Sequence, residues 1–182
     1  MRKITTVLFC FFVSIGMGSS FCLNQFETIR LNWKTFNGPN YTIQFPSDWE
    51  LNQSKQMGTE FFLFSPLESS QDKFRENVNL LIQDLAGYNI DLKKYAQMSE
   101  AQVKTMITNS NLLLSQEVKS PKGNYYHMAY TGDQGEFKLH FVQYYWVKNE
   151  KAYVLTFTAE KDKYASYSEV GSGILNSYEF TK

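Results

Sequence analysis

The chain has 182 residues, 18 basic and 18 acidic side chains, and an aromatic content of 16%. This length corresponds to one domain with a short extension, and the aromatic residues can fill a core without a disulfide scaffold. The zero net charge gives no indication of a nucleic acid or an anionic membrane surface as a partner, and no nucleic-acid binding is predicted.

The segment 1–20 has the pattern of a secretory signal peptide. Arg2 and Lys3 make its start positive, an almost continuous apolar run follows, and small residues end it. The apolar run is shorter than the roughly 20 residues that a transmembrane helix needs. Small residues allow cleavage after Gly18 or after Ser20, and we favour Ser20. The mature protein is therefore expected to be exported, as a periplasmic or secreted protein.

Cys22 lies just after this segment and is a candidate for lipidation. A bacterial lipoprotein carries its lipid on such a cysteine, with a small residue directly before it and usually an aliphatic residue three positions before it. Phe21 and Ser19 occupy these two positions, which disfavours a lipid anchor. The alternative is a lone thiol in an N-terminal arm over 21–40. Because Cys10 leaves with the signal, only an intermolecular disulfide stays open for this thiol.

A folded domain is predicted over 41–182, after the turn signal at 37–40. Residues 41–45 alternate between apolar and polar, which is typical of a half-buried strand, and Pro46 ends that strand. Further strands are predicted at 49–52, 60–64, 77–85 and 112–119, and three more form a meander over 124–160.

Two segments change to the spacing of amphipathic helices. One covers about 92–109 with Asp91 as its N-cap, and the other covers about 163–177. Gly171 and Gly173 weaken the second helix by roughly 1 kcal/mol each relative to alanine. We expect close packing on the sheet to explain why these glycines are tolerated.

The register of the predicted meander makes its middle strand, 136–148, apolar on both faces. A turn at 133–134 pairs one set of apolar residues, and a turn at 149–150 pairs a second set on the opposite face. The first set is Tyr130 with Phe137, Met128 with Leu139 and Tyr126 with Phe141; the second is Trp146 with Tyr153, Tyr144 with Leu155 and Val142 with Phe157. Such a strand belongs inside a sheet that has layers above and below it.

The same register places His127 directly opposite His140, and these are the two histidines of the chain. Two imidazoles on neighbouring strands are a weak candidate for a metal site or a pH-sensitive pair. No third ligand has the required spacing, and Lys138 on that face would repel a cation. A structural role is therefore favoured for both histidines, and no metal or cofactor is predicted.

No catalytic residues are predicted. Asp72, Glu76 and Asp84 flank a strand, but no spacing singles out two of them as an acid–base pair. The serines lack a nucleophile-elbow motif. The glycines at 171–173 follow no strand and precede no phosphate-binding lysine, so they do not form a nucleotide loop.

The aromatic residues of the meander have two interpretations. The residues concerned are Tyr125, Tyr144, Tyr145, Trp146 and Tyr153. They are core and sheet surface in the favoured interpretation, and they line an apolar pocket or a partner-binding patch in the alternative one.

Several motifs resemble the PsbP/DcrB-like superfamily, which also contains the Mog-type Ran-binding proteins. The matching features are Tyr41-Thr42-Ile43-Gln44-Phe45-Pro46-x-x-Trp49, Asn77-Val78-Asn79-Leu80, Leu92-x-x-Tyr95, Tyr130 in the aromatic meander, and the closing segment 174–180. The resemblance covers about 41–180. It implies an α/β (α+β) fold, an α/β/α sandwich around a central, mainly antiparallel sheet.

The resemblance also implies a function. Members of the superfamily are mostly non-enzymatic binding or assembly factors, and none of the ion-associated residues of its photosystem members has a match here. We therefore expect an exported, non-catalytic binding or assembly factor of the bacterial cell envelope, with an unknown envelope protein or component as its partner. Membrane anchoring is expected only if Cys22 is lipidated.

Two other functions stay open. The first alternative is a carrier of a small lipophilic ligand in an aromatic cavity, and the least favoured is an envelope hydrolase. An enclosed apolar cavity would favour the carrier, whereas a packed core would favour the binding factor.

Overall fold

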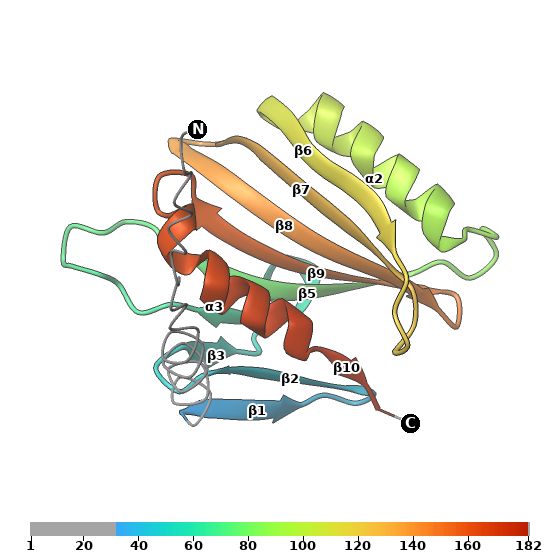
Figure 1. The fold of residues 1–182 in the computed structure, drawn as a ribbon, viewed down its shortest axis with the longest axis horizontal. Coiled ribbons are helices and arrows are strands. Elements are labelled where there is room, and N and C mark those ends of the chain that lie inside the picture. Colours follow the sequence, from blue (N-terminus) through green and yellow to red (C-terminus); the bar gives the residue numbers. More distant parts are fainter. Residues whose placement is uncertain (1–31, 182) are drawn as a thin grey trace, which may run out of the picture. The chain divides into compact units, whose positions relative to one another are not determined.

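A computed structural model describes residues 32–181. Its largest element is a seven-stranded antiparallel sheet (Figure 1). In sheet order the strands are β3 (Glu50–Asn52), β4 (Thr59–Phe64), β5 (Asn77–Asp84), β9 (Lys151–Glu160), β8 (Phe137–Lys148), β7 (Tyr125–Gln134) and β6 (Thr108–Val118). The predicted strands are thus present, and β8 lies inside the sheet as expected.

A smaller sheet and two helices complete the domain (Figure 1). The smaller sheet has the order β1 (Trp33–Asn37), β2 (Tyr41–Pro46) and β10 (Glu179–Phe180), and a 3-10 turn, η1 (Gln56–Gly58), precedes β4. The helices are α2 (Leu92–Met106) and α3 (Tyr164–Ser177). Neither the smaller sheet as a separate unit nor β10 was predicted, because two residues of strand carry no periodic signal.

The two helices pack on opposite faces of the large sheet. Helix α2 contacts β6, β7 and β8, whereas α3 contacts β9, β5 and the strand β2 of the smaller sheet. The arrangement confirms the predicted α+β fold with helices on both sides of an antiparallel sheet. Within residues 32–181, neither helix combines the length and hydrophobicity needed to span a membrane.

The stretch that opens the domain is part of the core on the α3 side. Tyr41 is 1% exposed, Ile43 is fully buried, and the Tyr41 ring stacks on Tyr178 with 5.4 Å between ring centroids. The predicted turn before β2 is present, with the Gly38 amide donating to the Tyr41 carbonyl at 2.9 Å. The alternation of this strand therefore directs its apolar side chains between the two sheets.

The first turn of the meander lies two residues later than predicted. Gln134 pairs with Phe137, so the turn begins at Gly135, whose φ of 61° favours glycine. Tyr130 consequently pairs with Phe141 and stacks on it at 4.7 Å. Because side chains alternate along a strand, a shift of two residues changes the partners and leaves the faces unchanged. Both faces of β8 are buried, as predicted.

The other predicted boundaries are largely confirmed. The second meander turn lies at 149–150, and Trp146 pairs with Tyr153. Asp91 caps α2, since its side chain accepts a hydrogen bond from the Lys94 amide at 2.7 Å. The helix ends three residues before the predicted end, because β6 already pairs with β7 from Thr108 onward.

Helix α3 lies unusually close to the sheet at Gly171. A Cβ atom at this position would lie 2.5–2.6 Å from ring atoms of Phe157, closer than any side chain can approach. The end of the helix is held to β2 by Ser177, whose hydroxyl accepts from the Gln44 amide at 2.8 Å. Close packing on the sheet, as predicted, explains the glycine at 171.

Lys163 at the start of α3 holds the loop 65–76 against the domain. Its Nζ lies 3.2 Å from a Glu68 oxygen, 3.1 Å from an Asp72 oxygen and 3.1 Å from a Glu160 oxygen. Glu68 and Asp72 belong to the loop and Glu160 to β9, so Lys163 joins the two; the exposure of Glu68 keeps the contribution of its pair small, whereas Asp72 is nearly buried.

Glu76 ends this loop and is buried with 0% exposure. Its carboxylate accepts long hydrogen bonds of 3.4 Å from the Ser65 hydroxyl and the Glu160 amide. Burial raises the pKa of the Glu76 carboxyl above its usual range, against the opposing effect of these contacts and of Lys163. The ionised side chain is therefore unfavourable in the folded state.

We predict that Gly171→Ala lowers the free energy of unfolding by about 1–3 kcal/mol, although alanine has the higher helix propensity. The added methyl group must displace Phe157 or the helix. Urea denaturation followed by circular dichroism measures the change, with Glu169→Ala on the exposed side of α3 as the control, expected within about 0.5 kcal/mol of wild type. Equal stability of the two variants would contradict the close contact.

We predict that Glu76→Gln becomes more stable relative to wild type as the pH rises. The folded-state pKa of Glu76 is raised above the value of 4.5 for the unfolded chain, so the folded protein binds more protons above that pH and wild-type stability falls with increasing pH. Urea denaturation at pH 4, 6 and 8 tests this, with Glu169→Gln as the exposed control. A difference from wild type that stays constant over this range would show that burial of the charge is not the cause.

Candidate functional site

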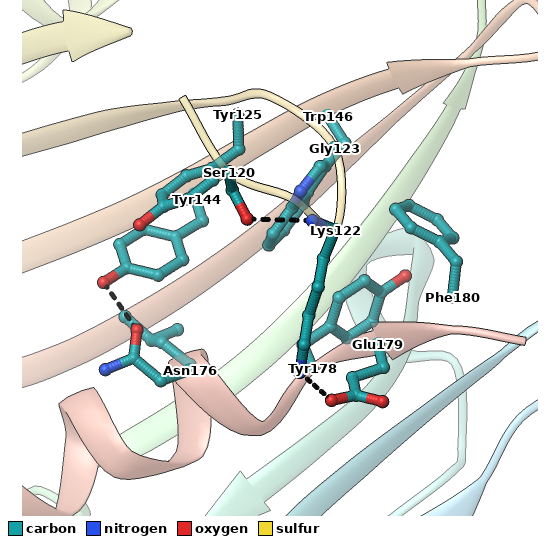
Figure 2. A pocket seen from close by; sticks show the side chains of 11 residues that line it. Ser120, Lys122, Gly123, Tyr125, Tyr144, Trp146, Asn176, Tyr178, Glu179 and Phe180 are labelled. Atoms are coloured by element: carbon teal, nitrogen blue, oxygen red, sulfur yellow. Dashed lines mark hydrogen bonds and ion pairs between the residues drawn. The ribbon is translucent and has the colours of Figure 1, made fainter. Parts of the chain in front are cut away.

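An open pocket lies on the α3 side of the large sheet, where the β6–β7 loop, β8, the end of α3 and β10 meet (Figure 2). It has a volume of about 430 Å³. Five aromatic side chains form its walls: Tyr125, Tyr144, Trp146, Tyr178 and Phe180. We call it the aromatic pocket.

The strand alternation of β7 and β8 places three of these rings side by side. Tyr144 and Trp146 are two residues apart on β8 and so project from the same face. Tyr125 on β7 lies beside both, with ring-centroid distances of 4.7 Å to Tyr144 and 5.6 Å to Trp146. These rings form a continuous aromatic wall.

The other two rings come from the end of the chain. Helix α3 ends at Ser177, and the following residue, Tyr178, packs on Trp146 with 5.0 Å between centroids. The ring centroid of Phe180 on β10 lies 6.0 Å from that of Trp146. The Lys148 Nζ lies over the Phe180 ring, 4.7 Å from its centroid. The position of α3 therefore determines where Tyr178 and Phe180 lie relative to the aromatic rings of β7 and β8.

Polar groups stand around the mouth of the pocket (Figure 2). Lys122 extends from the β6–β7 loop to form an ion pair with Glu179. The Tyr144 hydroxyl donates to the Asn176 side-chain oxygen at 3.1 Å. Because the Lys122 and Glu179 side chains are 68% and 50% exposed, their ion pair is weak, and a bound partner can separate it at little cost.

The pocket carries no net charge from its lining. Burial raises the pKa of the Tyr144 and Tyr178 phenols well above the ordinary tyrosine value, so both are neutral at physiological pH. The Asn176 amide, with its oxygen engaged by Tyr144, retains its NH2 group for a ligand. This combination of aromatic walls and a polar, charge-paired mouth is suited to binding an apolar or aromatic group beside hydrogen-bonding groups.

The aromatic residues considered in the sequence divide between pocket and core. Tyr125, Tyr144 and Trp146 come together in the aromatic pocket. Tyr145 projects from the opposite face, where it contacts Tyr95 of α2 at 5.7 Å, and Tyr153 is buried with 2% exposure. Each interpretation thus holds for part of the set.

The predicted pairing of the two histidines is wrong. His127 pairs with Tyr144 and His140 pairs with Thr131, which places the two imidazoles four residues apart along β8, or about 13 Å. Ligands of one metal ion must lie within roughly 4 Å of each other, so these two residues cannot share one. The cause is the position of the first meander turn, two residues beyond the predicted one.

Both histidines have structural contacts instead. His140 stacks on Tyr164 of α3 at 3.5 Å, and His127 packs edge-on against Tyr144 at 4.9 Å. Burial lowers the pKa of both imidazoles, with Lys161 adding to the effect at His140. Over residues 32–181, no group of three or more His, Cys, Asp or Glu side chains is arranged to hold a metal ion. Cys22, the lipidation candidate, lies outside the described residues.

The sequence did not indicate the part of the pocket that is formed by the β6–β7 loop and the segment after β9. Lys122, Asn176 and Glu179 were not considered as site residues. Lys122 and Glu179 are separated by 57 positions, and no local pattern connects residues so far apart. The segment 174–180 was recognised as the end of the second helix and as part of the family resemblance, but neither signal indicated a site there.

Solved structures of other proteins have the same fold. CyanoP, the cyanobacterial PsbP of Synechocystis sp. PCC 6803, has a TM-score of 0.61 at 11% sequence identity, over 82% of this chain and 92% of that chain. LpqN of Mycobacterium tuberculosis, described as involved in cell envelope biogenesis, has a TM-score of 0.64 at 14% identity, over 86% and 96%. A Pseudomonas aeruginosa protein of unknown function has a TM-score of 0.55 at 9% identity, over 80% and 95%.

At such low identities these structures are evidence for the fold alone. No curated protein matches the sequence. Family membership comes from the sequence itself, because the PsbP family model matches residues 32–180, from the strand β1 to the strand β10 that completes the aromatic pocket. The chain therefore belongs to the PsbP family, as the opening motif and the aromatic meander indicated.

Proposed function

We propose that this protein is an exported, non-catalytic binding or assembly factor of the bacterial cell envelope, and that it holds its partner at the aromatic pocket. The observation that carries the proposal is the pocket itself, which presents aromatic rings at a solvent-accessible mouth. Tyrosine and tryptophan are enriched among residues that dominate binding energies, because they bury a large area at a small entropic cost.

The exposed part of the pocket is suited to recognising a surface rather than an isolated molecule. Trp146 and Phe180 are half-buried, so each can lose further exposed area when a partner covers it. Lys122 and Glu179 provide one charge of each sign at the rim, and such rim charges contribute mainly to orientation and association rate. A partner with an apolar side chain or ring flanked by polar groups fits this arrangement.

Two further observations support the location in the cell envelope. The segment 1–20 has the pattern of an export signal. LpqN, a solved structure with the same fold, is described as involved in cell envelope biogenesis. The PsbP family, to which the chain belongs, consists mostly of accessory proteins without enzymatic activity, which supports a binding role.

We predict that Trp146→Ala and Lys122→Glu each reduce the recovery of a partner at least tenfold, equivalent to about 1.4 kcal/mol. The first removes the central ring, and the second places two negative charges together at the rim. The measurement is affinity capture of the tagged mature protein from its own cell envelope at physiological salt, followed by calorimetry with the recovered partner.

Lys119→Glu is the matched control, because Lys119 begins the β6–β7 loop, does not line the pocket and is paired with Glu117. It should retain the partner at near the wild-type level. Recovery of no specific partner by the wild-type protein, or equal recovery by all variants, would contradict binding at the aromatic pocket.

We predict that the mature protein is released from the signal after Ser20, or after Gly18, without a lipid. Intact-mass spectrometry of the protein isolated from its own cells should give the mass of the unmodified chain. Cys22→Ser should change this mass only by the difference between the two side chains. A wild-type chain that begins at Cys22 and carries a diacylglycerol mass would establish membrane anchoring and overturn the prediction.

A further inference from the structure

The α2 side of the large sheet carries a second hollow, on the face opposite to the aromatic pocket. Helix α2 packs on β6, β7 and β8 and reaches β5 near the end of that strand, where the Tyr95 hydroxyl donates to the Gln83 side chain; β4 and most of β5 lie outside its cover. The uncovered area holds a groove with a volume of about 620 Å³. We call it the sheet groove. Its walls are four phenylalanines: Phe62, Phe74, Phe137 and Phe141.

The floor of the sheet groove is polar. Asn77 pairs with Thr158 and Asn79 with Thr156 across β5 and β9, and all four side chains line the groove. Gln143 on β8 donates to the Thr156 hydroxyl at 3.1 Å. The result is a stripe of amide and hydroxyl groups between apolar walls, which is the composition of sites that bind and orient small molecules.

The groove continues beneath α2. An adjoining hollow of about 270 Å³ shares Leu81, Gln143 and Val154 with it and reaches the side of α2. Met57 lines the first hollow and is 83% exposed, and Met106 lines the second and is 76% exposed. Flexible methionines in the lining of such hollows adapt to ligands of different shape.

Exposed apolar side chains gather on this face of the molecule. Six large hydrophobic side chains are exposed over residues 32–181. Met57 lines the sheet groove and Met106 lines the hollow that adjoins it, whereas Tyr88 and Met98 line a further hollow beside α2, which shares Gln83 and Tyr95 with the second hollow. Apolar groups clustered around a concave surface mark binding sites, whereas scattered ones do not.

We propose that the sheet groove binds an uncharged lipophilic molecule that carries a hydroxyl, carbonyl or amide group. No Asp, Glu, Lys, Arg or His side chain lines the groove, so a charged ligand would lose its hydration without gaining a counterion. A pure hydrocarbon would instead cover the Asn79 and Thr158 polar groups without bonding them, which is also unfavourable. A neutral molecule with one polar group can pack its apolar part against the phenylalanine walls and form a hydrogen bond with the polar floor.

This site goes beyond the proposed partner-binding function, because it lies on the other face of the sheet and shares no lining residue with the aromatic pocket. It gives the carrier alternative a ligand class and a location, which is an open groove with a polar floor and not the enclosed apolar cavity expected of a carrier from the sequence. The groove is open at its surface, so the ligand can enter without unfolding of the domain.

The test compares two fluorescent probes that differ by one charged group. N-phenyl-1-naphthylamine is neutral and has one N–H donor, and 1-anilinonaphthalene-8-sulfonate is the same molecule with an added sulfonate. Titration of the mature protein should show binding of the neutral probe and at least tenfold weaker binding of the sulfonate. No binding of the neutral probe, or equal binding of both, would overturn the proposal.

Two variants, Asn79→Phe and Leu81→Phe, test whether the probe binds in the sheet groove. Both residues are half-buried on the uncovered face, and phenylalanine is favourable in strands, so each variant fills the groove from a position that tolerates a larger side chain. Each folded variant, checked by circular dichroism, should bind the neutral probe at least tenfold more weakly. Wild-type affinity in either folded variant would overturn the location.

Trp146→Ala separates this proposal from the partner-binding function. It alters the aromatic pocket alone and should leave binding of the neutral probe unchanged. Loss of probe binding in Trp146→Ala together with wild-type binding in Asn79→Phe would assign the probe to the aromatic pocket and refute the groove. Failure to capture a partner, in contrast, would leave the probe result intact.

Discussion

The structure depends on the strand β8, which is apolar on both faces. On β8, Phe141 and Tyr145 are buried toward α2, and Val142 and Tyr144 are buried toward α3. Because successive side chains alternate between faces, such strands are stable only with a layer on each side. The two helices supply these layers, and removal of their apolar faces from water is the main favourable term in folding.

The aromatic pocket is a consequence of how closely α3 approaches the sheet. Gly171 lets the helix contact Phe157, and Ser177 joins the end of the helix to β2. The chain leaves the helix directly into Tyr178 and β10, so that these rings reach Trp146 on β8. Packing in the core thus positions the residues that we propose to bind the partner.

The two faces of the sheet are covered to different extents. The α3 side is closed by a helix and by the smaller sheet, whereas α2 covers only part of the other side. The uncovered strands present apolar walls around a polar floor rather than the charged side chains of an ordinary solvent-facing sheet. The two hollows lie on opposite faces and share no lining residue, so the partner and the ligand that we propose for them would not compete for the same side chains.

The sequence by itself determined the strands of the large sheet, both helices, the Asp91 cap and the doubly buried β8, because each follows from side-chain spacing within a few residues. A turn misplaced by two residues left the faces correct, since alternation has a period of two, but it put His127 and His140 opposite each other. Only the tertiary structure determined that the aromatic pocket and the sheet groove exist and which residues line them. Lys122 and Glu179 meet across 57 positions, and the sheet groove exists because α2 leaves β4 and most of β5 uncovered. Contacts between residues far apart in the sequence depend on how helices and strands pack together, and the local periodicity of the sequence carries no information about that packing.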